Sequence, residues 1–171
     1  MRLRLNLFDV DMQLKIKYRK YDVDDFNGWA RTKLNLHSRY INYDIDSEIL
    51  MISEVNDLCH ALEDLVDGTM KTDFSMRFAE PDLEFKFYVA KRLYSNSKVI
   101  YTEGYCDVDI CLELFINFWC SGELGRNQFK MVLSRDEIEA FVTYLKVVIG
   151  ELQENDPRIL NYVNQGIILP E

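Results

Sequence analysis

Apolar and polar residues alternate with a period of two along the first part of the chain. The pattern begins at residues 14–18 and returns in residues 29–36 and 39–45, after a polar stretch at residues 22–28 that indicates a turn. A period of two places every second side chain on the same face of a strand. We therefore expect an antiparallel meander, whose first strand alternates Leu14, Ile16 and Tyr18 with Lys15, Lys17 and Arg19.

A different rhythm begins near Ser53 and predicts a helix. Its apolar residues recur at three- and four-residue steps, which places them on one helical face. Ser53 is a suitable cap for the free amides at the start, and Gly68 can end the helix in the left-handed conformation. Glu54 and Asp57 in the first turn suit the helix dipole. The apolar stripe consists of Val55, Leu58, Cys59, Leu62, Leu65 and Val66.

Strand patterns resume after this helix. Apolar residues alternate in residues 74–78 and again in residues 83–89. Residues 98–119 form the longest extended stretch, and because ordinary strands are much shorter we expect a bend or bulge near Gly104. Two glycines in residues 121–127 indicate a turn, and residues 129–133 read as a final strand.

The clearest predicted element is a second helix that begins after Ser134. Ser134 and Glu137 form a capping box, in which each side chain satisfies a backbone amide beside the other. Pro157 lies beyond the end of the helix, and residues 152–171 are expected to form a loosely ordered tail. The apolar stripe consists of Ile138, Phe141, Val142, Leu145, Val148, Ile149 and Leu152.

These elements predict a single α+β domain over residues 1–171. The expected architecture is one antiparallel sheet of about six to eight strands with two main helices, the C-terminal one packed on the sheet. A length of 171 residues and a hydrophobic content of 48% are sufficient for a core without a metal or a disulfide. No apolar run approaches the ~20 residues that a membrane span requires, and no signal peptide is evident. The predicted location is therefore the cytoplasm.

The net charge of −9 is distributed unevenly along the chain. Residues 2–20 are rich in lysine and arginine, whereas residues 40–70 hold eight acids and no lysine or arginine. Residues 103–123 add five more acids. Such a chain is repelled by nucleic acid, whose affinity for proteins depends on cationic side chains. It would attract a basic partner instead, and the alternative is a solvated acidic surface that aids solubility.

Tyrosines lie beside these acidic stretches and suggest a docking surface for a basic protein. Tyrosine is enriched among the residues that anchor protein interfaces. The alternative is that the tyrosines are ordinary cross-strand partners on exposed strand faces. The candidate partner-binding residues are Tyr40, Tyr43, Asp44, Asp46, Glu48, Asp107 and Asp109.

Carboxylates could carry chemistry at two places, but neither pattern is specific. Asp82 and Glu84 would share one face of a strand, close to Glu80, as a general acid–base pair requires. Leu83 and Phe85 already explain that strand as half-buried, and acids are common at strand entrances. The acids at 107, 109 and 113 lack the glycine-containing loop of a calcium site. We expect no catalytic residue, no metal and no cofactor.

The other motifs are also negative. The glycines of residues 122–127 lack the spacing of a phosphate-binding loop, and no serine or cysteine nucleophile has an evident histidine partner. His37 and His60 are not spaced as zinc ligands with the cysteines. We expect free thiols, typical of a reducing compartment, at Cys59, Cys106, Cys111 and Cys120.

Four features in order resemble one family. They are Trp29 followed by Lys33 and Leu34, the segment E-P-D-L-E-F at residues 80–85, the acidic strand at residues 109–118 and the capped helix after Ser134. Together they resemble the WapI-type immunity proteins, antidotes of contact-dependent bacterial toxins, over roughly residues 10–152.

The resemblance implies a non-catalytic protein that binds a cognate toxin domain and blocks it stoichiometrically. Such toxins are often nucleases with basic surfaces, which would suit the acidic excess. Two alternatives stay open: a small-molecule-binding domain or enzyme that uses the carboxylate cluster, and an adaptor subunit of a larger assembly. The oligomeric state is also open.

Overall fold

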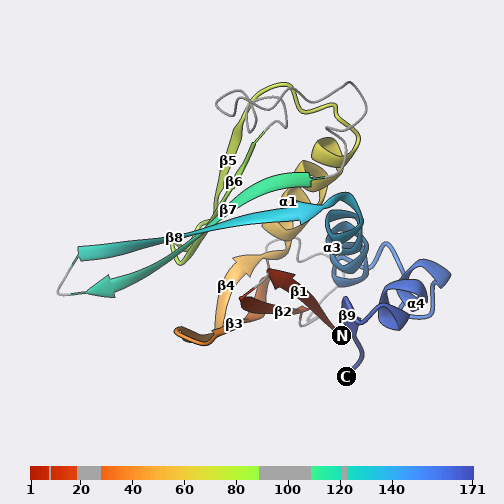
Figure 1. Ribbon diagram of the computed structural model, residues 1–171, viewed down its shortest axis with the longest axis horizontal. Helices are drawn as coiled ribbons and strands as arrows, with labels where there is room; N and C mark the ends of the chain where they lie inside the picture. Colours follow the sequence, from red (N-terminus) through yellow and green to blue (C-terminus); the bar gives the residue numbers. More distant parts are fainter. Residues whose placement is uncertain (8, 19–27, 89–108, 121–122) are drawn as a thin grey trace.

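The computed structural model describes residues 1–7, 9–18, 28–88, 109–120 and 123–171. These residues form two antiparallel sheets, of five and four strands, and three helices (Figure 1). The α+β class is therefore confirmed. The expectation of one sheet was wrong, because alternation along a strand does not reveal which strands pair with one another.

The first sheet has the strand order β4-β3-β2-β1-β9. Strands β1 to β4 follow one another along the chain as an antiparallel meander. The sequence predicted the last three of them, whereas β1 was missed. The register places Leu3 opposite Leu14, and Leu14 opposite Leu34, so one face of the sheet is an apolar row. The strands are β1 (Arg2–Leu7), β2 (Val10–Tyr18), β3 (Trp29–Ser38), β4 (Asn42–Met51) and β9 (Ile168–Leu169).

The second sheet has the strand order β5-β6-β7-β8. Strands β7 and β8 are long and extend well beyond the rest of the sheet (Figure 1). The predicted turn at residues 121–127 was wrong from Glu123 onward, because β8 begins there. The bend expected near Gly104 lies outside the described residues. The strands are β5 (Phe74–Arg77), β6 (Leu83–Phe87), β7 (Asp109–Cys120) and β8 (Glu123–Ser134).

Helix α1 (Ile52–Val66) continues directly from β4 and separates the two sheets in the sequence. Its cap position is Met51 and not Ser53 as predicted. The Glu54 carboxylate accepts a hydrogen bond from the Met51 backbone N–H at 2.8 Å. Glu54 in the first turn therefore provides a capping hydrogen bond that was expected from Ser53. Gly68 has φ +69°, which confirms the left-handed end of the helix.

Helix α3 (Arg135–Val148) begins with the predicted capping box of Ser134 and Glu137. Ile138, Phe141 and Leu145 are fully buried on its apolar face. The helix packs against α1 and contacts strands of both sheets. The hydroxyl of Tyr144 accepts a hydrogen bond from the Ile16 amide at 2.7 Å, which ties α3 to the first sheet.

The segment predicted to be a loosely ordered tail forms α4 (Pro157–Asn164) and β9. Pro157 occupies the start of α4, where its missing N–H is not needed. Ile159 and Ile168 are fully buried, and β9 pairs with β1. Ile159 follows a polar stretch and β9 has only two residues, so neither element gave a pattern long enough to predict it.

Buried side chains from both sheets and all three described helices belong to one hydrophobic cluster. The core faces of β6 and β7 contribute Leu83, Phe85, Leu114 and Ile116 to it. No helix in the described part of the chain is long and apolar enough to cross a membrane.

Candidate partner-binding surface

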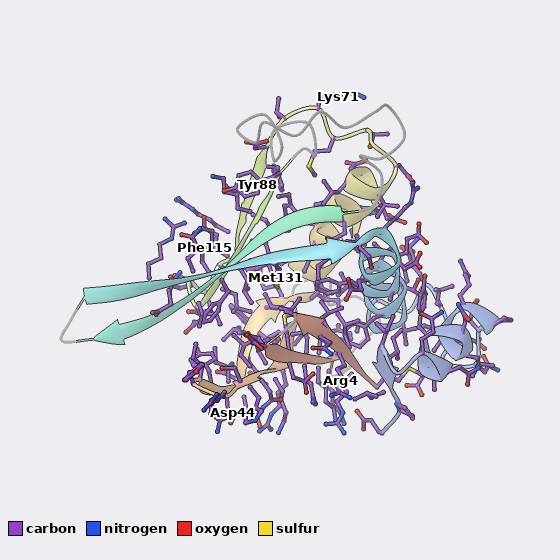
Figure 2. All side chains as sticks on the ribbon, in the orientation of Figure 1. Arg4, Asp44, Lys71, Tyr88, Phe115 and Met131 are labelled. Carbon is purple, nitrogen blue, oxygen red and sulfur yellow. The ribbon has the colours of Figure 1, made fainter. Side chains whose placement is uncertain are left out.

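Three of the predicted partner-binding acids lie on β4, an edge strand of the first sheet. Asp44, Asp46 and Glu48 occupy alternate positions and are exposed, so the strand presents them on one face. Figure 2 shows Asp44 at the outer side of the first sheet. The structure therefore brings these three acids together as the alternation suggested.

The neighbouring strands place cations beside these acids. Asp46 accepts hydrogen bonds from Arg31 Nε at 2.6 Å and Nη2 at 3.1 Å, and forms an ion pair with Lys33 Nζ at 2.5 Å. The Arg31 hydrogen bonds, followed by that from Lys33, lower the pKa of Asp46 to about 2. Asp44 accepts a hydrogen bond from the Asn35 amide, and Glu48 lies opposite Arg31. Cations of β3 therefore neutralise part of the negative charge that the acids of β4 carry.

The turn between β3 and β4 carries the most exposed aromatic residue of the candidate set. Tyr40 is 83% exposed and Ile41 is 40% exposed. Ser38 Oγ accepts hydrogen bonds from the amides of both residues, which fixes the turn. The Arg39 guanidinium lies 5.5 Å from the centre of the Tyr40 ring. Tyr43 differs, because it is half-buried and burial raises its pKa.

The two remaining candidate residues are described less fully. Asp107 lies outside the described residues. Asp109 is the first residue of β7, and only its backbone is described.

A second group of exposed acids lies on α1. Asp57 and Asp64 line a groove of about 530 Å³ between α1 and β5, together with His60 and the exposed ring of Phe74. The Asp57 carboxylate has no hydrogen-bond or ion-pair partner among the described residues, whereas that of Glu63 on the same helix pairs with Lys146. These acids belong to the same acidic stretch, but the sequence analysis did not select them. The acids on β4 and those on α1 differ in the number of cationic side chains near them in space. The positions of the residues along the chain do not show this difference.

The carboxylate cluster does not form an acid–base pair. Asp82 precedes β6 in a turn, and its backbone oxygen accepts a hydrogen bond from the backbone N–H of Asn117 at 2.9 Å. Glu84 lies within β6 and is 7% exposed. Its Oε1 lies 3.0 Å from Arg126 Nη2 and 3.4 Å from Arg77 Nε. The expectation that Asp82 and Glu84 share a strand face was wrong, because β6 begins only at Leu83.

Glu84 borders a pocket of about 290 Å³ on the second sheet that the sequence analysis missed. The Arg126 guanidinium stacks on the Phe115 ring at 3.9 Å from its centre. Figure 2 places Phe115 on the second sheet, away from Asp44 on the first. The residues that line the pocket are Arg77, Phe78, Pro81, Leu83, Glu84, Asn117 and Arg126.

Cys59 is a free thiol buried against α3. Burial raises its pKa to about 12, so it remains protonated near neutral pH. The adjacent His60 is exposed, with Nδ1 at 3.2 Å from the Glu63 carboxylate. Cys106 is outside the described residues, and only the backbones of Cys111 and Cys120 are described. Among the described side chains, no three metal-ligating residues form a group.

Comparison with known proteins gives one result that covers most of the chain. The model of the immunity protein WapI-like family matches residues 8–153. No curated protein and no solved structure matches the chain significantly. The match begins before β2 and ends after α3, so it includes both sheets except β1 and β9. The chain belongs to the WapI-like family of immunity proteins.

Proposed function

We propose that this protein neutralises a cognate bacterial toxin domain by stoichiometric binding and without catalysis, in the cytoplasm of the cell that makes it. The observation that carries the proposal is the family match over residues 8–153. Glu84 supports a non-catalytic role, because it pairs with Arg126 and Arg77 and no second carboxylate lines its pocket among the described residues.

The contact surface we propose is the β3–β4 hairpin with its exposed turn. Tyr40 would insert into the partner as an anchor, since tyrosine supplies a large rigid contact area. Asp44 and Glu48 would face cations of a basic toxin domain, and Tyr43 would support the turn from below. Asp46 would have to exchange its contacts with Arg31 and Lys33 before it could bind a partner.

Charge supports a basic partner. The net charge of −9 includes exposed acids on both β4 and α1, and these produce a negative field over more than one face. A toxin domain that binds nucleic acid carries a basic surface for that purpose. An antidote that covers this surface would exclude the substrate from it, which is sufficient to block the toxin.

Co-expression with the toxin domain encoded by the neighbouring gene tests the proposal. The wild-type chain should restore growth and form a 1:1 complex in size-exclusion chromatography with light scattering. Tyr40→Ala should weaken binding at least tenfold, as loss of an interface anchor does. Leu160→Ala is the matched control, because Leu160 is 50% exposed on α4 and lies outside the proposed surface.

Absence of both rescue and complex formation would contradict the proposed function. Rescue with equal binding by wild type and Tyr40→Ala would instead reject only the hairpin as the contact surface.

A further inference from the structure

Glu84, Asn117 and Arg126, which line the pocket on the second sheet, lie on the face that points away from the core. Leu114 and Ile116 of β7 belong to the hydrophobic cluster, so the alternate residues Phe115 and Asn117 point to the opposite side. Both are nevertheless buried, with 5% of their surface exposed. Glu84 and Arg126 lie directly opposite Phe115 and Asn117, respectively, and share their face.

Asn117 holds one polar atom without a partner among the described residues. Its Nδ2 donates to the backbone oxygen of Pro81 at 2.7 Å, which fixes the orientation of the side-chain amide. Its Oδ1 is buried and accepts no hydrogen bond from any described residue. Buried acceptors without a donor are rare in native proteins, and each requires an explanation. The fixed orientation means that a simple rotation of the amide cannot relieve it.

The groups around Oδ1 complement it in hydrogen-bonding type. Arg126 gives one N–H to Glu84 and stacks on Phe115, so its guanidinium plane is held in place. A guanidinium carries five N–H donors, and within the described part of the chain only Glu84 accepts from that of Arg126. The site therefore combines the Asn117 oxygen, which needs a hydrogen-bond donor, with N–H groups of Arg126, which can donate to an acceptor.

We propose that this pocket binds the side-chain carboxamide of a glutamine or asparagine of the partner protein. The N–H of the carboxamide would donate to Asn117 Oδ1, and its oxygen would accept from an arginine at the rim. A carboxylate would meet Glu84 and the Asn117 oxygen, and a cationic group would meet two arginines. The pocket lies on a sheet face, so it receives a side chain, whereas a backbone strand would pair at an edge.

Access to Oδ1 requires movement at the rim. The side chain of Arg77 is 76% exposed, so it can swing outward while Arg126 stays stacked on Phe115. The E-P-D-L-E-F segment builds the pocket wall, because Pro81, Leu83 and Glu84 all belong to it. Identification of the partner as a toxin rests on the proposed function, but the chemistry of the pocket does not.

Three small probes of the same shape test the chemistry directly: acetamide, acetate and acetamidinium. Each is titrated into the labelled protein while the side-chain amide of Asn117 and the Nε–H of Arg126 are followed by NMR. Acetamide should give saturable shifts at both groups, with at least tenfold weaker binding of the two charged probes. The side-chain amide of Asn35 on the first sheet is the internal control and should not move.

Every other outcome overturns the proposal. Preferential binding of acetate would make the pocket an anion site, and preferential binding of acetamidinium would make it a cation site. No saturable shift with any probe would make Asn117 a purely structural residue. Arg126→Lys keeps a cation for Glu84 and should weaken acetamide about fivefold through loss of one hydrogen bond. Arg158→Lys on α4, outside both proposed contact sites, should change nothing.

Co-expression separates this inference from the proposed function. If the wild-type chain does not protect against the toxin domain, the proposed function fails, whatever the probes show. If the wild type protects and Arg126→Lys binds the toxin with the same affinity, the carboxamide pocket is not a contact with the toxin. A fivefold or larger loss of affinity in Arg126→Lys, with no change in Arg158→Lys on α4, is the expected result.

Discussion

Each sheet carries, on its outer face, a carboxylate that forms ion pairs with two cationic side chains. On the first sheet Asp46 pairs with Arg31 and Lys33, and 34% of its side chain is exposed. On the second sheet Glu84 pairs with Arg77 and Arg126, and only 9% of its side chain is exposed. The charge pattern is therefore similar, but the solvation of the carboxylate differs strongly.

The difference decides what each face can do. An exposed ion pair contributes little to stability, and its members can exchange partners at low cost. The first sheet thus offers charges that can steer and adapt to a partner. A buried carboxylate must keep its hydrogen bonds, so the second sheet offers a fixed arrangement. Charges that can exchange partners favour fast association, whereas polar groups held in fixed positions favour recognition of one chemical group.

The largest expected effect separates the two carboxylates by stability. Arg126→Met should lower the free energy of unfolding by about 2 kcal/mol, because buried Glu84 loses a charged hydrogen bond. Arg31→Met removes the equivalent partner of exposed Asp46 and should leave the urea midpoint unchanged within error. Equal effects of the two substitutions would show that burial does not distinguish the faces.

The second expected effect concerns the association rate with the toxin domain. The triple variant Asp44→Asn, Asp46→Asn, Glu48→Gln should slow association severalfold at about 50 mM salt and lose most of this effect at about 500 mM, because salt screens exposed charges. Dissociation should change less. Stopped-flow or surface-based kinetics at several salt concentrations measures both rates.

The matched control for this variant is on α1 and on Asp67, the residue that follows its end. Asp57→Asn, Asp64→Asn, Asp67→Asn removes the same number of acids from a region with fewer compensating cations. A larger loss of rate in the α1 variant would move the contact surface to the groove between α1 and β5. Association without salt dependence in the wild type would remove electrostatic steering altogether.

The smallest expected effect is the acid dependence of the first sheet. Hydrogen bonds from Arg31 and Lys33 lower the pKa of Asp46 from 3.8 to about 2. A depressed carboxyl pKa contributes stability above its unfolded value, and this contribution is lost as pH falls through about 2. The Asp46→Asn variant should therefore lose slightly less stability than the wild type between pH 4 and 2. Urea unfolding at several pH values across that range measures the difference. An identical pH profile would mean that the pair is not formed in solution.

Local patterns were sufficient to predict much of the fold. The α+β class, the first meander and the capped helix after Ser134 follow from alternation, helical spacing and one capping box, all of which act between near neighbours in sequence. The third helix was missed because α4 is short and its buried face depends on a single residue, Ile159. The second sheet was missed because strand pairing is a property of the tertiary structure.

The candidate surface was less predictable, because charge compensation depends on strand register. Asp46 and Lys33 are 13 positions apart but directly opposite in the β3–β4 pair. Asn117 gave no signal in the sequence at all, because its unpartnered oxygen results from the placement of Pro81 more than thirty positions earlier. Selection of the exposed acids was feasible from sequence, whereas the distinction between free and paired acids was not.

The most direct test of the account is the stoichiometry of toxin inhibition. Purified toxin domain is titrated with this protein while toxin activity and complex mass are measured together. We predict that activity falls linearly to zero at one equivalent, with all of the toxin in a 1:1 complex. Inhibition at far less than one equivalent would indicate catalysis, and undiminished activity at excess antidote would contradict the binding role.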